Sequence, residues 1–258
     1  MFDTPKVDCF GTNTEEIRRM SEPKRLDKRL VELIQCSRND AIKYVEGGWV
    51  LVDGEIIDEP QFQVLEQKVE LHANATLAPS ALSTILLNMP DSFDVNNPAA
   101  ALKLITPATR EVDDGSGIRT LKRHFVRLMS TAPLEPGATG LMVFSQDGRV
   151  VNRLVKNADK NEQEYVVEVS GEMEANGLNK LKRGMKIGHW TLPGAKVSWQ
   201  NENRLRFALK NVRPGQIELM CKNVGLSVVS STRIRIGRVP MAKLPPGQWR
   251  YLPLGVLF

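Results

Sequence analysis

The sequence has little of what several large protein classes require. It contains three cysteines, Cys9, Cys36 and Cys221, an odd number scattered along 258 residues, which argues against a disulfide framework and favours a reducing compartment. No apolar run reaches the roughly 18–20 residues of a membrane-spanning helix. The first residues also lack the apolar core of a signal peptide. We therefore expect a cytoplasmic protein that has no membrane partner.

The signatures of common nucleotide and cofactor enzymes are missing as well. There is no P-loop, no G-x-G-x-x-G and no G-x-S-x-G, so a kinase, a dehydrogenase or a hydrolase has no support from motifs. The three histidines, His72, His124 and His189, have no partner at metal-ligand spacing, and the cysteines are isolated. We expect neither a metal site nor a small-molecule cofactor.

Acidic residues are scarce in the regions where basic residues gather. Residues 178–213 hold nine Lys or Arg and one acid, Glu202, and residues 219–258 hold six Lys or Arg and no acid. A third group surrounds His124 without a carboxylate: Arg119, Lys122, Arg123 and Arg127. Clustered positive charge attracts a polyanion, of which nucleic acid is the commonest. Each cluster alone is also compatible with an ordinary solvated surface, but three together predict RNA or DNA binding.

Composition and hydrophobic pattern divide the chain into four segments. Residues 1–22 are polar and aperiodic and are predicted to form a flexible tail. Residues 23–72 form a small module, residues 73–84 are a proline-broken linker, and residues 85–258 make a larger domain.

The small module is predicted to contain two helices and a hairpin. Apolar residues recur at helical spacing over 26–34, and Ser37 has the character of an N-cap, with Asp40 placed to complete a capping box. A strand over 49–52 then turns at Asp53-Gly54 and returns.

The amino-acid sequence of this module is more specific than its hydrophobic pattern. R-L-D-K-R-L-V-E-L, C-S-R-N-D-A-I-K-Y-V and G-G-W-V-L-V-D-G-E-I-I resemble the RNA-binding domain named after ribosomal protein S-four. In that family basic side chains of the two helices lie against RNA phosphates. The resemblance implies this role for Lys24, Arg25, Lys28, Arg29, Arg38 and Lys43. Arg25 and Arg38 stand at motif positions. Arg29 and Lys43 can also be explained as residues on the solvent-exposed face of an amphipathic helix.

The larger domain alternates in the manner of β-strands with few helices between them. Strands are expected over 165–169, 204–209 and 226–236, the last with a basic exposed face on which Arg233 and Arg235 point the same way. Without regular β-α-β alternation, we predict an α+β fold with a mostly antiparallel mixed sheet.

The segment most informative about chemistry is L-E-P-G-A-T-G-L-M-V-F-S-Q-D-G, residues 134–148. It resembles the active-site segment of bacterial pseudouridine synthases of the RsuA type, G-R-L-D-x-x-x-x-G-L-L-L-L-T-N-D-G. In that family the aspartate starts cleavage of the uracil glycosidic bond, and the base is reattached through carbon five. Here Glu135 holds the position of the aspartate, and Ala132-Pro133 replaces the Gly-Arg before it.

Other motifs of the family can also be recognised in this sequence, but several of their charged residues are replaced. Met89 and Gln163 stand where the family has lysine, and Glu218 stands where it has arginine, while Tyr165, which the resemblance implies stacks on the uracil, remains. The final stretch, I-R-I-G-R-V-P-M-A-K-L-P-P-G-Q-W-R-Y-L, follows the family closely. A glutamate moves the carboxylate outward by one methylene, and a misplacement of about 1 Å can cost roughly a hundredfold in rate.

The leading hypothesis is therefore a cytoplasmic protein that binds structured RNA, ribosomal by the resemblance, with weak or absent isomerase activity. Its site would comprise Glu135 and Tyr165, and its phosphate contacts would include Arg123, Arg233 and Arg235 beside the helices of the small module. One alternative is a working synthase that uses Glu135 in place of aspartate. Another is an interaction scaffold whose basic surface meets an acidic protein.

Overall fold

The computed structural model describes residues 22–78, 81–91, 98–135, 137–188 and 190–258. Apart from residue 22, the predicted tail over 1–22 lies outside this part of the chain. The chain forms two compact units that divide between residues 80 and 81, and the segment predicted as a linker spans that point. Each unit is described by itself.

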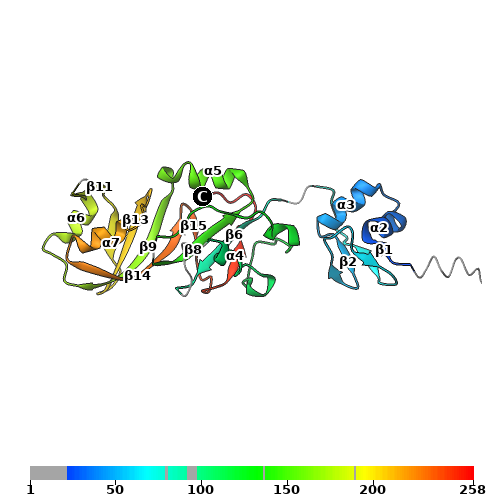
Figure 1. Ribbon diagram of the computed structural model, residues 1–258, viewed down its shortest axis with the longest axis horizontal. Coiled ribbons are helices and arrows are strands. Elements are labelled where there is room, and N and C mark those ends of the chain that lie inside the picture. Colours follow the sequence, from blue (N-terminus) through cyan, green and yellow to red (C-terminus); the bar gives the residue numbers. More distant parts are fainter. Residues whose placement is uncertain (1–21, 79–80, 92–97, 136, 189) are drawn as a thin grey trace, which may run out of the picture. The chain divides into compact units, whose positions relative to one another are not determined.

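The first unit packs two helices on short strands (Figure 1). Its elements, in chain order, are β1 (Lys24–Arg25), α2 (Leu26–Ile34), α3 (Arg38–Glu46), β2 (Val50–Val52), β3 (Glu55–Ile56), β4 (Gln63–Val64) and β5 (Val69–Leu71). β2 is the middle strand of a three-stranded antiparallel sheet, and β1 pairs with β4. Leu30, Ala41, Val45 and Val50 are fully buried and form the core between helices and sheet.

Local chemistry explains where these elements begin and turn. The Ser37 side chain accepts a hydrogen bond from the Asp40 amide at 3.1 Å and so caps the N-terminus of α3, as predicted. Asp53 and Gly54 both have positive φ, 52° and 86°, which is the conformation of the two-residue hairpin turn expected between β2 and β3.

The second unit is built on a nine-stranded sheet. Its strands are β6 (Thr84–Met89), β7 (Met129–Ser130), β8 (Ala138–Ser145), β9 (Glu162–Gly171), β12 (Lys196–Trp199), β13 (Arg204–Lys210), β14 (Leu226–Ile236), β15 (Val239–Pro240) and β16 (Trp249–Tyr251). A separate hairpin joins β10 (Gly184–Ile187) to β11 (Trp190–Pro193). The helices and 3-10 turns are α4 (Pro98–Leu102), η1 (Pro107–Thr109), η2 (Lys122–Phe125), α5 (Gly148–Val155), η3 (Ala158–Lys160), α6 (Gly177–Arg183) and α7 (Gln216–Lys222).

The main path of the sheet runs β12-β13-β9-β14-β8-β6-β16. Every pairing in it is antiparallel except that of β14 with β8, which confirms the predicted α+β class with a mostly antiparallel mixed sheet. At the parallel pairing, Gly140 has φ 95° and a Cβ there would lie 2.4 Å from the carbonyl oxygen of Arg233. Only glycine fits where these two strands meet.

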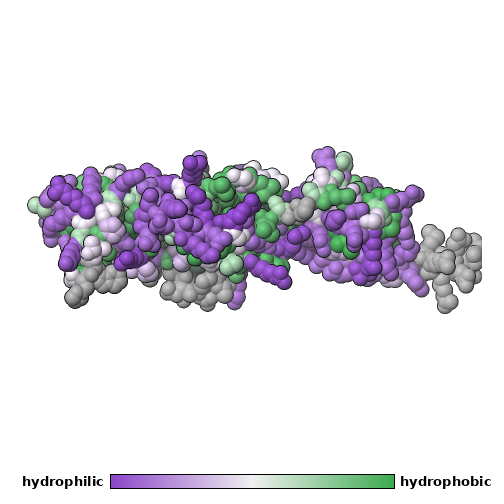
Figure 2. Space-filling view, turned by 90° about the horizontal axis from the view of Figure 1, so that it is seen from above, coloured by the Kyte–Doolittle hydropathy of each residue, from purple (hydrophilic) through white to green (hydrophobic). Residues whose placement is uncertain are grey.

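Helices cover the sheet unequally. α6 and α7 bury Leu181, Ile217 and Met220 against Tyr165 and its neighbours on β9 and β13 (Figure 1). α5 packs on β8 through Val150 and Leu154, and α4 lies over another cluster that contains Phe144 and Trp249. The surface is mainly hydrophilic on the face seen in Figure 2, with hydrophobic residues interspersed.

Candidate functional site

One cavity of the second unit, of about 380 Å³, contains both residues predicted to carry the chemistry. Glu135 and Tyr165 line it, together with Pro133, Leu134, Gln163 and further residues of three segments: 130–132, 154–158 and 211–214. Its volume lies in the range of roughly 300–1,000 Å³ usual for small-molecule sites. The segment that precedes β8, the end of α5 and the loop before α7 therefore converge on Glu135.

The Glu135 side chain is buried and only partly satisfied. The residue is 8% exposed, and its Oε1 atom has no hydrogen-bond partner within the described residues. Burial raises the pKa of Glu135 to about 7; the Ile217 amide and the charge of Arg233 oppose this rise, while the charge of Glu218 adds to it. This carboxyl group therefore ionises less readily than an ordinary glutamate.

Arg233 lies beneath this cavity rather than at the surface. Its side chain is fully buried and donates hydrogen bonds to the carbonyl oxygens of Ala132, Pro133 and Leu141 and to Gln163 Oε1. The predicted exposed basic face at Arg233 is wrong, because β14 turns this residue toward the core. The guanidinium is committed to these acceptors, and no ion pair joins it to Glu135 within the described residues.

Tyr165 is held in the wall of the cavity by the same network. Its hydroxyl donates to Gln163 Oε1 at 2.9 Å, and Arg233 Nη1 donates to the same oxygen at 3.0 Å. The tyrosine is 1% exposed, so little of its ring is open to a base in this conformation. Gln163 acts as an acceptor for both groups, which a lysine at this position could not do.

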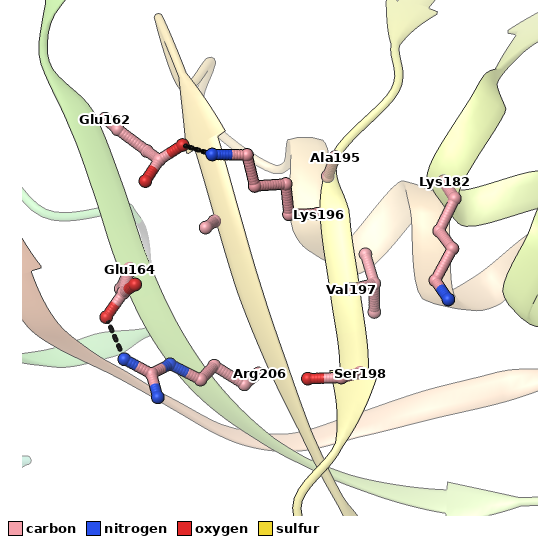
Figure 3. Close-up of a pocket in the computed structure, with 9 residues that line it drawn as sticks. Glu162, Glu164, Lys182, Ala195, Lys196, Val197, Ser198 and Arg206 are labelled. Atoms are coloured by element: carbon pink, nitrogen blue, oxygen red, sulfur yellow. Dashed lines mark hydrogen bonds and ion pairs between the residues drawn. The ribbon is translucent and has the colours of Figure 1, made fainter.

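A second, larger cavity of about 610 Å³ lies on the open face of the sheet (Figure 3). Glu162 and Glu164 of β9 point across it to Lys196 and Arg206, and both also pair with Arg235 of β14. These contacts lower the pKa of Glu164 to about 2, the hydrogen bond from Arg235 contributing most. The two glutamates, Lys196 and Arg206 are thus all paired, whereas Lys182, which also lines this cavity, forms no ion pair among the described residues. Because most of the charge here is neutralised, we place the functional site at Glu135 and not here.

The same pairing corrects the interpretation of the basic run over 178–213. Four of its nine cations form ion pairs with glutamates: Lys180 with Glu174, Lys196 with Glu162, Arg204 with Glu168 and Arg206 with Glu164. Arg235 is engaged in the same way, with Glu162 and Glu164. It is not the free cation on an exposed strand face that its spacing from Arg233 indicated.

In the first unit, the two cations expected to be the main RNA contacts converge on one carboxylate. Asp27 is fully buried and accepts hydrogen bonds from Arg25 at 3.0 Å and from Arg38 at 3.4 Å. Burial alone would raise the pKa of Asp27, but these hydrogen bonds and that from the Lys28 amide hold it below its usual value. Arg25 and Arg38 keep part of their side chains exposed, 38% and 60%, so Asp27 orients them while a face of each still meets solvent.

The remaining predicted contacts are at the surface. Lys24 and Arg29 pair with Glu32, Lys43 pairs with Asp40, and Lys28 is exposed. Arg123 of η2 is also exposed. Among the residues that the structure describes, no three metal-ligating side chains gather in one place, and no helix there is long and apolar enough to cross a membrane. His189 falls outside those residues.

Comparisons with known proteins agree on one family. The model of the S4 domain matches residues 24–69. The chain is 25% identical over 228 residues to the dual-specificity RNA pseudouridine synthase RluF of Escherichia coli K12, covering 88% of this chain and 75% of that protein. It is 26% identical over 238 residues to ribosomal small subunit pseudouridine synthase A of Vibrio parahaemolyticus, covering 88% and 95%.

A solved structure supports the fold. A crystal structure of a pseudouridylate synthase matches with a TM-score of 0.55 at 21% identity and covers 88% of this chain and 95% of that one. Sequence reasoning placed Glu135 and Tyr165 in one site, assigned Arg233 to an exposed face instead of this site, and missed the buried neighbour Cys221. No pattern marks the position of either residue, because strand and helix packing alone brings them to Glu135.

Proposed function

The chain belongs to the RsuA/RluF-type family of RNA pseudouridine synthases, and from that premise we propose that it binds structured ribosomal RNA with weak or absent isomerase activity. The S4 domain and the name of the small-subunit relative support ribosomal RNA as the ligand. Cytoplasmic localisation follows from that ligand and is part of the proposal.

The observation that carries the proposal is the state of Glu135. A carboxylate attacks as a nucleophile only when it is ionised, and burial raises the pKa of Glu135 to about 7. In addition, the extra methylene displaces the group from the position of an aspartate, and misplacement by about 1 Å can cost roughly a hundredfold in rate. Both effects lower the rate of the same step.

The surroundings of Glu135 reinforce this conclusion. The position before Leu134 holds Pro133, whose side chain carries no charge, and Arg233 is bound to backbone carbonyls. Glu218, where relatives of this type have arginine, adds negative charge beside the carboxyl and raises its pKa further. The charge of Arg233 lowers the pKa of Glu135 and that of Glu218 raises it, so the two oppose each other and burial decides the direction of the shift.

The proposal is tested by measuring RNA affinity and pseudouridine formation on the same bacterial ribosomal RNA transcripts. We expect the native protein and its Glu135→Ala variant to bind with equal affinity, each weakening steeply as salt rises, and to form no pseudouridine. Gain of activity in Glu135→Asp would identify the methylene as the main defect. Pseudouridine formed by the native protein and lost in Glu135→Ala would instead show a working synthase.

Affinity that is weak and insensitive to salt would contradict the RNA-binding half of the proposal. It would favour the alternative in which the basic surface meets an acidic protein.

A further inference from the structure

The strand β12 lies at one end of the main sheet path and leaves one of its edges unpaired. It pairs with β13 alone among the described strands. An edge strand presents unpaired backbone groups to which another chain can pair, and proteins often protect such edges with charge or with a covering segment. Here the cover is partial. The Ala195 amide donates to the Leu181 carbonyl of α6 at 3.2 Å, one residue before β12 begins.

The hydrogen-bonding pattern shows which groups of β12 face this edge. The Gln200 amide donates to the Arg204 carbonyl at 2.8 Å, which fixes the pairing at the turn between β12 and β13. Bonded pairs alternate along an antiparallel ladder. Ser198 therefore bonds to β13, whereas Val197 and Trp199 direct their N–H and C=O groups away from it. Within the described residues these four outward groups have no backbone partner, which is the arrangement that an added strand requires.

The cavity of about 610 Å³ reaches this edge as well as the sheet face. It is lined by residues 195–198, which are the residue before β12 and the first three of the strand. Because successive side chains of a strand point to opposite faces, a cavity that contacts all four lies along the edge. Lys182 of α6 lines it too, and in Figure 3 this lysine and the glutamates of β9 appear on opposite sides of β12.

The carboxylates on the sheet face of this cavity are already engaged. The two glutamates of β9, Glu162 and Glu164, have four carboxylate oxygens, and each accepts a hydrogen bond from a cation: Lys196, Arg206 or Arg235. Lys196 and Arg206 each still have N–H groups that these bonds do not use. Donors are therefore in excess over acceptors around β12.

Unpaired cations add to this excess at the end of α6. Lys182 and Arg183 are exposed, and neither forms an ion pair among the described residues. A Cβ on Gly194 would lie 2.2 Å from the Lys182 carbonyl oxygen, so α6 ends directly against the chain that leads into β12. One exposed acid, Glu202, lies in the turn after β12. With the three cations that hold the glutamates, five cations face three carboxylates, and the edge is positive.

This charge selects among possible occupants of the edge. Pairing β12 with the same strand of a second copy would place Lys196 and the cations of α6 against their own counterparts, and like charges across a strand pairing are destabilising. An extended segment that carries carboxylates meets complementary charge instead. The occupant that fits is therefore an acidic strand from a different protein.

We propose that the β12 edge binds an extended acidic segment of a partner protein, which joins the sheet as an additional strand. The outward backbone groups of Val197 and Trp199 pair with the segment, and Lys182 and Arg183 contact its carboxylates. The Trp199 side chain, 39% exposed, gives it an aromatic surface on which to pack. This surface does not share a residue with the lining of the Glu135 cavity, and the inference does not depend on RNA binding.

The test of strand addition uses the full-length protein and a fluorescent peptide of alternating glutamate and valine, roughly eight residues long. Fluorescence anisotropy measures its affinity. Two further peptides carry N-methyl groups, one on every valine and the other on every glutamate. Alternate residues of a strand direct their N–H groups to opposite edges, so one modified peptide should lose binding and the other should keep it. Equal effects of the two modifications, or no binding of the parent peptide, would overturn the proposal.

The charge preference is tested with two double variants that reverse equal charge. Lys182→Glu with Arg183→Glu changes the β12 edge, and Lys103→Glu with Lys243→Glu changes exposed lysines that do not line this cavity. The edge variant should bind the parent peptide roughly tenfold more weakly than the native protein, and the control variant should stay close to native. An equal loss in both variants would show attraction by net charge alone and would refute the assignment to this edge.

Discussion

At the scale of single residues, the pKa of Glu135 links the site to stability. Its value is about 7 in the folded protein against an ordinary value of 4.5. The folded state therefore binds the proton more tightly than the unfolded chain. The stability that Glu135 contributes is fully present below pH 4.5 and is lost as pH rises through 7, a loss of about 3 kcal/mol.

Glu135→Gln should remove this loss, because the amide resembles the protonated acid in shape and charge. We expect the variant to exceed the native protein in free energy of unfolding by about 1–3 kcal/mol at pH 8 and to match it at pH 4.5. Urea unfolding at the two pH values measures both differences. Equal stability of the two proteins at pH 8 would show that Glu135 ionises freely in the fold.

His124 has the opposite effect on stability. It is 3% exposed, its Nδ1 lies 3.0 Å from the Tyr251 hydroxyl, and its Nε2 has no partner among the described residues. Burial lowers the pKa of His124 from 6.5 to about 4, with the charges of Arg123 and Arg110 adding to the effect. Its contribution to stability is thus present above pH 6.5 and lost as pH falls toward 4.

We predict that His124→Asn makes unfolding less sensitive to acid. Asparagine can keep a polar atom near Nδ1 for Tyr251 but cannot gain a charge in this pH range. Native stability should fall by about 3 kcal/mol through this one group between pH 6.5 and pH 4, and that component should vanish in the variant. A thermal-unfolding series over this range compares the two slopes; identical slopes would contradict the assignment.

At the scale of elements, the S4 domain shows which features can be predicted from residues that are close in sequence. α2 and α3 begin and end close to where spacing and capping residues predict, and the Asp53-Gly54 turn has the expected positive φ values. These features depend on residues close in sequence, so they could be read without tertiary information. The convergence of Arg25 and Arg38 on Asp27 could not, because it needs two elements packed together.

Ser37→Ala tests the contribution of a single cap. Ser37 Oγ accepts from the Asp40 amide at the start of α3. Removing this acceptor should destabilise the first unit by about 1 kcal/mol. Ser37→Asp, which restores an acceptor, serves as the control and should recover most of the loss in a chemical-denaturation experiment. A Ser37→Ala variant as stable as the native protein would show that the cap contributes nothing measurable.

For β14, the sequence pattern predicts the bounds of the strand but not the direction of its side chains. Its bounds, Leu226–Ile236, agree with the prediction, but the side chains of Arg233 and Arg235 do not share an exposed face. The pairing of β14 with β9 shifts register between these two residues. A bulge of this kind breaks the two-residue alternation on which the prediction relied.

At the scale of the whole molecule, charge counted along the chain differs from charge in space. The run over 178–213 contains one acid in sequence, yet β9 supplies Glu162, Glu164 and Glu168 to its cations through the antiparallel pairing with β13. Long-range pairing, together with the pair of Lys180 with Glu174, therefore neutralises four of the nine cations in a region that the sequence marks as basic. Four exposed cations that form no ion pair among the described residues adjoin the lining of the Glu135 cavity: Lys156, Lys160, Lys210 and Arg213. Two of them, Lys156 and Lys160, belong to no counted cluster.

The fold class and the position of the site followed from motif resemblance, because the frame around Glu135, Tyr165 and the last strands is retained. The protonation of Glu135 depends on its burial and on the hydrogen bonds that Arg233 and Gln163 already make. Only the packed structure shows these. Whether Glu135 acts as a nucleophile is therefore the central question about this protein.

The most direct measurement is pseudouridine formation on a bacterial ribosomal RNA transcript under single-turnover conditions, with protein in excess, from pH 6 to pH 9. We predict no detectable product from the native protein at any pH, although the transcript is bound. Product that rises with pH through about 7, where Glu135 ionises, and that is absent in Glu135→Gln would contradict it and establish a working synthase with a glutamate nucleophile.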